Sequence, residues 1–499
     1  MHFIGLEIAA AGTHAVAIDL DTARVVSRGA VAHTWLDAPP TGYREQDPLE
    51  WIAAADGAMR QCIAGLGNAA DDVVAIGVAG PLRGWVALDE NDRIVRPAKI
   101  GGDRSARRQV EEIGRAFGGA PGLLELTGHA VGIDSFAAES YWLKHHEPAH
   151  FQQTKHLLSP QDFIAYWMSG QRGTEPGTAS TTGLFDIRGR VWSRELIDFI
   201  DPGLYQMLPD VGPSDQIRGL LRSALAHEWG LPEHTVIGPC SAAPMLCALA
   251  SGCVVNGSVS VDLAPVTTIL AAGSSPVIDL GGEILASCHA SGEWLGHASS
   301  PNTTSAPEVM RRHYGWSPEK FEATVASVLP GADGLLMLPY FHGETIPNLP
   351  EGSGVLHGIT HQNLTPANLV RAAVEGAALG IGYTLSRLQD MGFNPPEIRL
   401  TGDAANSRIM RQLLADVLGT PCTPVSSEQG AAVGAAMQAA VAFFRHSGET
   451  LGFEEIAGYI VTEDGARTCE PNLSLYPIYQ EMMARQQYLV DTLHPAGFL

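Results

Sequence analysis

The sequence is poor in cysteine and in positive charge. Its 7 cysteines are scattered over 499 residues, and no two of them form a CxxC pair. We therefore predict neither a disulfide framework nor a zinc site, and we expect a reducing, cytoplasmic location. Lys and Arg number 31 against 54 Asp and Glu, which gives a formal net charge of −23. Such a surface repels a polyphosphate backbone, so we expect no nucleic-acid partner.

Long hydrophobic runs are also missing. The longest candidate, residues 242–255, is too short to span a membrane and predicts a buried helix. At the N-terminus Glu7 interrupts the apolar run and no basic region precedes it, so we expect no signal peptide. A chain of 499 residues is too long to fold around one hydrophobic core, so we expect two large domains, 1–240 and 241–499.

Apolar alternation predicts an antiparallel meander of three strands at the start of the chain, over residues 3–9, 14–20 and 24–33. A helix over 48–66 follows, with Asp47 as its cap and Pro48 in its first turn. Residues 71–80 predict a buried strand and 84–97 a hairpin. Further helices are predicted over 103–116, 135–146 and 160–169.

A second strand–turn–strand pattern, SVSVDLAPVTTILAAG, begins near residue 258. The helices predicted after it cover residues 366–389, 406–418, 428–444 and 476–493. Two domains that each combine a meander with helices indicate an α/β fold with a duplicated architecture. This is the pattern of the two-domain actin-like ATPases, a duplicated ribonuclease H-like fold that binds nucleotide in the cleft between its domains.

Several segments, in order along nearly the whole chain, resemble the FGGY carbohydrate kinases and the xylulokinases in particular. The stretch YREQDPLEW resembles that family's EQDP-x-x-W segment, and GVAGPLRGWVALDENDRIVRPAKIGGD resembles its AGQMHG…RPAI-x-W-x-D block. The stretch LPYFHGETIPNLPEGSGVLHGIT resembles LPYLSGERTP followed by G-x-x-x-GLT. The segments 369–381 and 398–422 resemble the helix and the adenosine site that follow.

The resemblance implies an ATP-dependent sugar kinase that acts on a ketose or a polyol. Such enzymes transfer the γ-phosphoryl group of ATP, with Mg²⁺ and loop amides holding the phosphates and a carboxylate accepting the hydroxyl proton. It implies ATP and Mg²⁺ as cofactors if the chain is active, and none otherwise. Dimers are common in the family, and nothing in this sequence demands one.

The opening hairpin departs from the family pattern G-x-D-x-G-T-S/T. Gly5, Glu7, Ala9, Ala10 and Ala11 stand in these places. Alanine brings no hydroxyl and disfavours the positive φ that phosphate loops often need. Glu7 keeps a carboxylate that could hold Mg²⁺ through water; the alternative is a strand residue without a role.

The corresponding hairpin of the second domain departs in the same way. Where the family has L-G-T-S, this chain has Leu263, Ala264, Pro265 and Val266. Pro265 has no N–H to offer a phosphate oxygen, and Val266 has no hydroxyl. We therefore expect both phosphate-binding turns to be weakened.

The catalytic base of the family is missing. Alignment of residues 248–252 with the family's A-V-G-V-G places Ala243 where the aspartate belongs. A slip of the alignment does not help, because Ser241, Ala242 and Pro244 are not carboxylates either. The nearest acid downstream is Asp262, on the next predicted strand, so no local group can accept the proton.

The sugar pocket is altered as well. Arg83 stands where xylulokinases have a substrate-contacting histidine, and Gly101 replaces the Trp of W-x-D, whereas Asp103 matches its Asp. Arg83 could bind hydroxyls, a carboxylate or a phosphate, or form a salt bridge to a nearby acid. A site role and a structural role remain open for Asp103.

At the adenosine site, the family's G-G-G-A becomes Gly402, Asp403, Ala404 and Ala405. Asp403 would place negative charge near the triphosphate, which disfavours its binding. The helix that flanks the purine in the family is matched by Ser407, Met410 and Arg411.

Other motifs predict structure rather than chemistry. The stretch HEPAH has the zincin spacing, but Pro148 should break the helix that such a site needs. The arginines of DRSARR (Arg104, Arg107 and Arg108) could bind an anion but fit a solvated helix face better. His342 and Glu344 are expected to support the domain interface. We expect Cys240, Cys247 and Cys253 to pack in the core.

Two hypotheses follow. The first is a xylulokinase-like enzyme with an atypical site, which would bind Mg-ATP and phosphorylate a ketose or polyol. The second is an inactive kinase-like protein that binds a small metabolite for sensing or regulation. The surviving scaffold favours the first, whereas the missing base and both altered turns favour the second.

Overall fold

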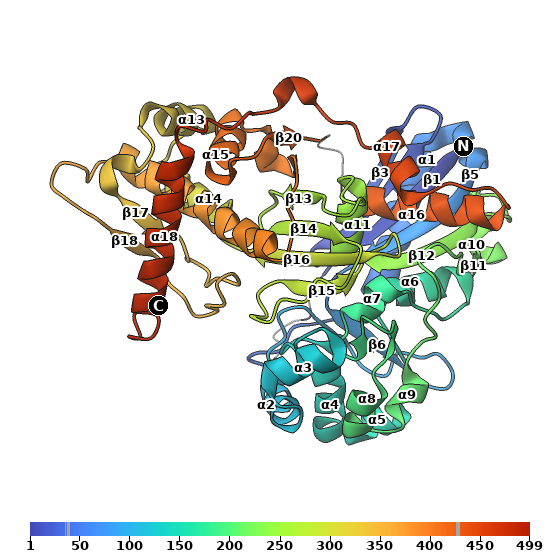
Figure 1. Cartoon of the computed structure of the whole chain (residues 1–499). Helices are drawn as coiled ribbons and strands as arrows, with labels where there is room; N and C mark the ends of the chain where they lie inside the picture. Colours follow the sequence, from blue (N-terminus) through green and yellow to red (C-terminus); the bar gives the residue numbers. More distant parts are fainter. Residues whose placement is uncertain (35, 37–39, 426–429) are drawn as a thin grey trace. The chain divides into compact units, whose positions relative to one another are not determined.

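A computed structural model describes the chain over residues 1–499 except 35, 37–39 and 426–429 (Figure 1). The chain divides into two compact units. Unit 1 comprises Met1–Val254, Ala272–Gly296 and 428–461, and unit 2 comprises Val255–Ala271, His297–Ser427 and Thr462–Leu499. Among the described residues, no helix combines the length and the apolar character that a membrane crossing requires.

The strands of unit 1 are β1 (His2–Ile8), β2 (Gly12–Asp19), β3 (Arg24–Ala32), β4 (Glu45–Gln46), β5 (Val73–Gly80), β6 (Gly84–Leu88), β7 (Ala98–Ile100), β8 (His156–Leu158), β9 (Phe185–Asp186), β10 (Val191–Trp192), β11 (Gly219–Leu220), β12 (Val236–Ala242) and β15 (Leu285–Cys288). Its helices are α1 (Pro48–Leu66), α2 (Arg107–Ala116), α3 (Gly119–Thr127), α4 (Phe136–His146), α5 (Pro148–Gln153), α6 (Pro160–Ser169), α7 (Pro176–Ser180), α8 (Arg194–Ile200), α9 (Leu204–Met207), α10 (Ser223–Trp229), α11 (Ala243–Ala250), α16 (Ala431–His446) and α17 (Phe453–Ile460).

Unit 2 contains β13 (Val259–Asp262), β17 (Leu336–Leu338), β18 (Val355–His357), β19 (Ile398–Thr401), β20 (Cys422–Pro424), α12 (Ser305–His313), α13 (Pro318–Ser327), α14 (Pro366–Asp390), α15 (Arg408–Leu418) and α18 (Tyr476–Leu493). Strands β14 (Thr267–Gly273) and β16 (Trp294–Ser300) each contain a division point between the units.

The main sheet of unit 1 has six strands in the order β11-β12-β5-β1-β2-β3. Strands β1, β2 and β3 form the antiparallel meander that the sequence predicts, and β1 and β12 both run parallel to β5. Parallel neighbours bring their carboxyl ends to one edge of a sheet, which is where α/β proteins bind ligands.

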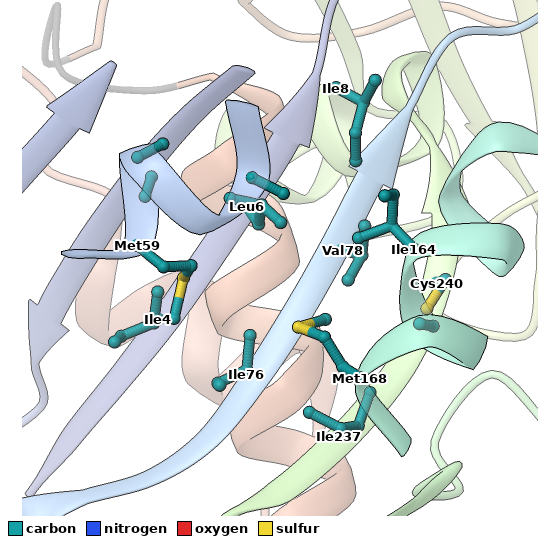
Figure 2. Packing of buried hydrophobic residues seen from close by; sticks show 14 of the residues in the cluster. Ile4, Leu6, Ile8, Met59, Ile76, Val78, Ile164, Met168, Ile237 and Cys240 are labelled. Atoms are coloured by element: carbon teal, nitrogen blue, oxygen red, sulfur yellow. The ribbon is translucent and has the colours of Figure 1, made fainter. Parts of the chain in front are cut away.

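Helices cover both faces of this sheet because the strand residues are apolar on both sides. On one face, Ile4, Leu6 and Ile8 of β1 pack with Met59 of α1 and Ile164 of α6 in a single buried cluster (Figure 2). Every one of these side chains is less than a tenth exposed. Unit 1 is therefore a three-layer α/β/α structure.

The opposite face is covered by α16, which lies very close to the strands (Figure 1). A Cβ added at Gly5 would overlap the carbonyl oxygen of Ala432, and one at Gly77 would overlap that of Ala435. Gly434 of α16 in turn abuts the carbonyl oxygen of Leu246 in α11. The small residues of GAAVGAAMQAA thus allow the backbones to approach closely.

The second sheet has the order β15-β16-β14-β13-β19-β20. Strands β13 and β14 pair as the predicted hairpin, and β19 runs parallel to β13. In unit 2 the long helix α14 carries a buried ion pair in which Arg371 Nε donates to Glu375 Oε1 at 2.8 Å and Arg371 Nη2 to the Tyr479 hydroxyl at 2.9 Å. This network joins α14 to α18.

Most of the predicted elements are confirmed. Helix α1 has the predicted bounds, and Asp47 caps it by accepting from the Leu49 N–H. Helix α2 begins at Arg107 rather than 103, because the Asp103 carboxylate accepts from the Ser105 N–H and holds that stretch as a turn. Residues 428 and 429, the predicted start of α16, lie outside the described residues. The domain boundary at residue 240 remains a prediction.

Candidate functional site

Three parallel strands of unit 1 end in register. Glu7 of β1 lies opposite Ala79 of β5, and Ser241 of β12 lies opposite the same Ala79 from the other side. The next residues along β12 lead into Ala243, and Arg83 follows β5 by three positions. The topology thus brings the strand ends that carry Glu7, Arg83 and Ala243 to one edge of the sheet.

The opening hairpin turn forms without the backbone geometry of a glycine-rich loop. The Ala9 N–H donates to the Gly12 carbonyl at 2.9 Å, and Gln46 Nε2 donates to the Ala10 carbonyl at 3.0 Å. Neither Ala10 nor Ala11 has a positive φ. The alanines are therefore not strained by a left-handed backbone, and they bring no hydroxyl to the turn.

The start of α11 carries no carboxylate. Ala242 is the cap residue and makes no side-chain hydrogen bond, and Ala243 is the first residue of the helix and is partly exposed. The Ser241 hydroxyl is buried and exchanges hydrogen bonds with the Gln438 amide of α16, at 3.2 and 3.0 Å. No group at this helix start can take up a proton.

Asp103 is completely buried and organises its own loop. Its carboxylate accepts from the Arg44 N–H at 2.8 Å, from Lys99 Nζ at 3.0 Å and from the Ser105 N–H at 2.9 Å. Lys99 is also fully buried and lies 4.1 Å above the Trp142 ring. The observed contacts of Asp103 are structural; a substrate contact of Asp103 remains a prediction.

Arg83 lines a small pocket of unit 1 that leaves about 20 Å³ accessible to a water-sized molecule. Its Nη1 donates to the Thr181 carbonyl, and its Nε lies 3.7 Å from Asp134 Oδ1. The pocket also has Gln161 and Asp162 in its wall. The sequence argument missed Asp134, Gln161 and Asp162, although the Ser159-x-x-Asp162 spacing is a helix-capping signal.

Asp162 is 2% exposed, and burial raises its pKa to about 7, while the nearby Arg218 and the hydrogen bond from Ser159 act in the opposite direction. The Ser159 hydroxyl donates to Asp162 Oδ2 at 2.7 Å. The carboxyl therefore changes its charge near neutral pH, which is a property common at functional sites.

In unit 2 the carbonyl of Ala264 holds the turn between β13 and β14 by hydrogen bonds from two threonine hydroxyls. The Ala264 carbonyl accepts from the hydroxyls of Thr304, at 2.9 Å, and Thr267, at 3.3 Å. Val266 is 54% exposed, and Pro265 has no N–H. The turn therefore has no N–H at position 265 and no hydroxyl at position 266, and its weakened phosphate binding stays a prediction.

Asp262 ends β13 beside this turn, and burial raises the pKa of its carboxyl while a hydrogen bond from Thr401 Oγ1 at 3.0 Å lowers it. Gly402 has φ +81°, and a Cβ there would lie 2.7 Å from Asp262 Oδ1. The glycine is therefore required for the close approach of β19 to β13.

The predicted adenosine segment folds as a short 3-10 helix, Asp403–Asn406, which includes Ala404 and leads into α15. Ser407 caps α15 by accepting from the Met410 N–H, and Arg411 Nη1 donates to the carbonyls of Ala405 and Asn406 at 2.7 and 2.9 Å. These contacts fix the segment; purine binding by Gly402, Asp403, Ala404 and Ser407 stays a prediction.

Comparison with known proteins agrees with this geometry. The family model described as "FGGY family of carbohydrate kinases, N-terminal domain" matches residues 2–249, and that for the C-terminal domain matches residues 277–443. The chain belongs to the FGGY family of carbohydrate kinases. It is 28% identical over 493 residues to a xylulose kinase of Haemophilus influenzae, with 98% of each chain covered. A xylulose kinase of Streptomyces rubiginosus is 29% identical over 88% of this chain and 87% of the relative.

Solved structures of FGGY kinases share the fold. A structure titled as a xyloylose kinase from Brucella ovis superposes with a TM-score of 0.91 at 25% identity, covering 99% of this chain and 100% of that one. The xylulose kinase of Rhodospirillum rubrum gives 0.90 at 26% identity, with 99% of each chain covered. The predicted α/β fold, the two-domain actin-like ATPase fold, is thereby confirmed.

The remaining motifs of this FGGY chain are structural. In HEPAH, α4 ends at His146 and α5 begins at Pro148, so the two histidines lie on different helices, as predicted. No group of three or more His, Cys, Asp or Glu side chains in the described part of the chain could hold a metal ion. Arg107 and Arg108 are exposed on α2, and Glu344 is buried and accepts from Asn302 Nδ2 at 3.0 Å.

Proposed function

We propose that this chain binds a small ketose or polyol in unit 1 and phosphorylates it from Mg-ATP far more slowly than a kinase with an acidic residue at the start of α11. Membership of the FGGY family and the names of its relatives, xylulose kinases, support the reaction class. The observation that carries the slow rate is the sequence Ala242-Ala243-Pro244, which offers no proton acceptor at the strand edge where Glu7 and Arg83 are gathered.

Of the groups that the resembled family uses to hold Mg-ATP, this chain keeps one carboxylate, Glu7, whereas both phosphate-binding turns are altered. Glu7 offers one carboxylate at the carboxyl end of β1, where it would hold the ion through water. When bound, Mg²⁺ would neutralise phosphate charge. The two hairpin turns provide neither the hydroxyls nor, at Pro265, the N–H that would bind the phosphates. Positioning of the nucleotide is therefore weakened together with proton transfer.

The second candidate function is metabolite binding without catalysis. The observation that favours it is that both turns are altered. Each alteration alone would weaken ATP binding, and the two together weaken it further. In this case the chain would bind a sugar or polyol and show no ATP-dependent turnover at all.

Restoring the base separates the two candidates. Ala243 is partly exposed at the first helical position, where an aspartate is accommodated by the helix dipole. Ala243→Asp is expected to raise kcat by about 10²- to 10⁴-fold, the usual contribution of a positioned general base. Ala243→Asn is the matched control, because it has the same size and cannot accept the proton. The measurement is the rate of sugar phosphate formation from Mg-ATP over ketopentoses and polyols.

A gain in Ala243→Asp that Ala243→Asn lacks supports the kinase with a missing base. No turnover in the parent chain or in either variant rejects the kinase proposal and leaves the binding function. Equal rates in all three proteins contradict the assignment of position 243.

A further inference from the structure

Cys422 of β20 and Cys469 lie directly opposite each other on two antiparallel segments of unit 2. The Cys422 N–H donates to the Cys469 carbonyl, and the Cys469 N–H donates to the Cys422 carbonyl, both at 3.0 Å. Residues paired by two such hydrogen bonds have Cα atoms about 5.5 Å apart and side chains on the same face. Disulfides join Cα atoms about 4.4–6.8 Å apart, so this pairing suits a disulfide without movement of the backbone.

Both cysteines are thiols in the structure and both are buried, with Cys422 0% and Cys469 6% exposed. Each Sγ donates to the carbonyl two positions earlier, that of Thr420 at 3.7 Å and that of Arg467 at 3.8 Å. Burial raises the pKa of the Cys422 thiol, and a charge on Cys469 raises it further, since the two thiols interact electrostatically. Cys422 is therefore a poor first nucleophile, because the thiolate is the reactive form.

Cys469 belongs to a segment of unit 2, residues 464–472, which we call the strap. Of the strap residues, all of which the structure describes, only Cys469 is buried. Hydrogen bonds to β20 and α15 hold the strap: the Asp464 N–H to the Pro424 carbonyl at 3.0 Å, Gln412 Nε2 to the Glu470 carbonyl at 2.8 Å, and the Asn472 N–H to Asp416 Oδ1 at 2.8 Å. A segment held at the surface in this way opens locally far more easily than a core, and its opening exposes Cys469.

The strap also supports the segment in which the resemblance predicts the adenosine site. Arg411 Nε donates to the Arg467 carbonyl at 3.2 Å, and Arg467 Nη2 donates to Asn406 Oδ1 at 3.0 Å. Asn406 ends the 3-10 helix that contains Asp403 and Ala404. A covalent bond at position 469 therefore fixes a segment that supports this short helix.

We propose that Cys422 and Cys469 form a reversible disulfide when the chain meets a low-molecular-weight disulfide such as glutathione disulfide. The Cys469 thiolate attacks one sulfur of this oxidant, which forms a mixed disulfide and releases one glutathione thiolate. The Cys422 thiolate then attacks the Cys469 sulfur, which forms the Cys422–Cys469 bond and releases the second glutathione. The protein loses two electrons and two protons, and the oxidant takes them up as two glutathione thiols.

The bridge has two consequences for the chain. It encloses residues 423–468, and closing so long a loop removes conformational freedom from the unfolded chain. It also ties the strap to β20, so the strap opens less often. This modification site does not depend on the proposed kinase reaction, and neither does its test.

The test exposes the native, fully reduced chain to excess glutathione disulfide, counts free thiols after denaturation and maps linked peptides by mass spectrometry. The wild-type chain is expected to lose two of its 7 thiols to a linked Cys422–Cys469 pair, and dithiothreitol is expected to restore both. Amide hydrogen exchange over the strap is expected to be at least about tenfold slower in the bridged chain than in the reduced chain. Cys62→Ala, at a buried cysteine of α1, is the matched control and is expected to form the same bridge.

The single variants test the order of the two steps. Cys422→Ala is expected to stop at the mixed disulfide and to carry one glutathione on Cys469. Cys469→Ala is expected to leave Cys422 unmodified, because opening of the strap exposes Cys469 and not the strand residue. No linked pair in the wild-type chain, linkage of either cysteine to a different one, or unchanged strap exchange in the bridged chain overturns the proposal. Glutathione on Cys422 in Cys469→Ala overturns it as well, because the order of attack is then reversed.

Discussion

Two buried aspartates of unit 1 show how surroundings decide the state of a carboxyl group. Asp103 is matched by the buried Lys99 ammonium and by two backbone N–H donors. Asp162 has the Ser159 hydroxyl and a more distant Arg218, and burial outweighs them, so its pKa rises to about 7. The first residue anchors a loop, whereas the second changes its charge at the wall of the pocket.

The raised pKa of Asp162 makes stability depend on pH. Between about pH 4 and 7 the folded chain keeps a proton at Asp162 that the unfolded chain, with a value of 3.8, releases. Folding therefore binds protons, and this contribution to stability declines as pH rises through that window. Asp162→Asn stays neutral throughout, so its stability relative to wild type should increase by up to a few kcal/mol from about pH 5 to about pH 8.

Thermal unfolding of both proteins at the two pH values checks this prediction. The Asn oxygen can still accept from the Ser159 hydroxyl, and the backbone N–H of residue 162 can still donate to Ser159 Oγ, so the cap of α6 is kept. A difference in Tm between the proteins that is the same at both pH values would contradict a protonated Asp162 in the folded chain.

At the scale of elements, the close packing of α16 against the sheet depends on glycines, which have no side chain. Gly5 and Gly77 on the strands and Gly434 on the helix leave no room for a Cβ, because backbone carbonyls of Ala432, Ala435 and Leu246 occupy that space. Backbone cannot shift as a flexible side chain can. The segment GAAVGAAMQAA is thus a packing requirement of the sheet whose strand ends gather the site.

Gly434→Ala is expected to destabilise the chain by about 1–3 kcal/mol through overpacking against Leu246, despite a better helix propensity. Gly380→Ala in α14 is the matched control, because nothing lies within 4 Å of a Cβ at that helical position. The control is expected to gain up to about 1 kcal/mol. Chemical denaturation of both variants measures the difference, and a stabilised Gly434→Ala would show that α16 is not seated as described.

At the scale of the whole molecule, the sequence predicts the scaffold well and the site only in part. Strand alternation, the Asp47 cap and the small-residue helices are local signals, and they predicted β1 to β3, α1 and α16. Ala243 begins α11, and its assignment as the position of the missing base stays a prediction. Asp134 and Gln161 could not be predicted, because they lie 51 and 78 positions after Arg83 in the sequence and meet Arg83 and its pocket only through tertiary packing.

This contrast between scaffold and site characterises the molecule. The six-stranded sheet, its two helical layers and the close packing of α16 against the strands are intact. The fold matches FGGY kinases over nearly the full chain. The changes that the resemblance predicts concentrate at the expected phosphate-binding turns and at the expected position of the base: Ala10 and Ala11, Pro265 and Val266, and Ala243. Random substitution along the chain would also have changed the buried core residues.

The most direct test is the initial rate at which the unmodified chain phosphorylates ketopentoses and polyols with saturating Mg-ATP. Kinases typically turn over at about 1–100 s⁻¹, and loss of a positioned base costs about 10²- to 10⁴-fold. We therefore predict a rate below about 1 s⁻¹ for every one of these substrates. A turnover of several per second on any of them would contradict the account, because it would require a proton acceptor and phosphate-binding groups that the start of α11 and the two altered turns do not provide.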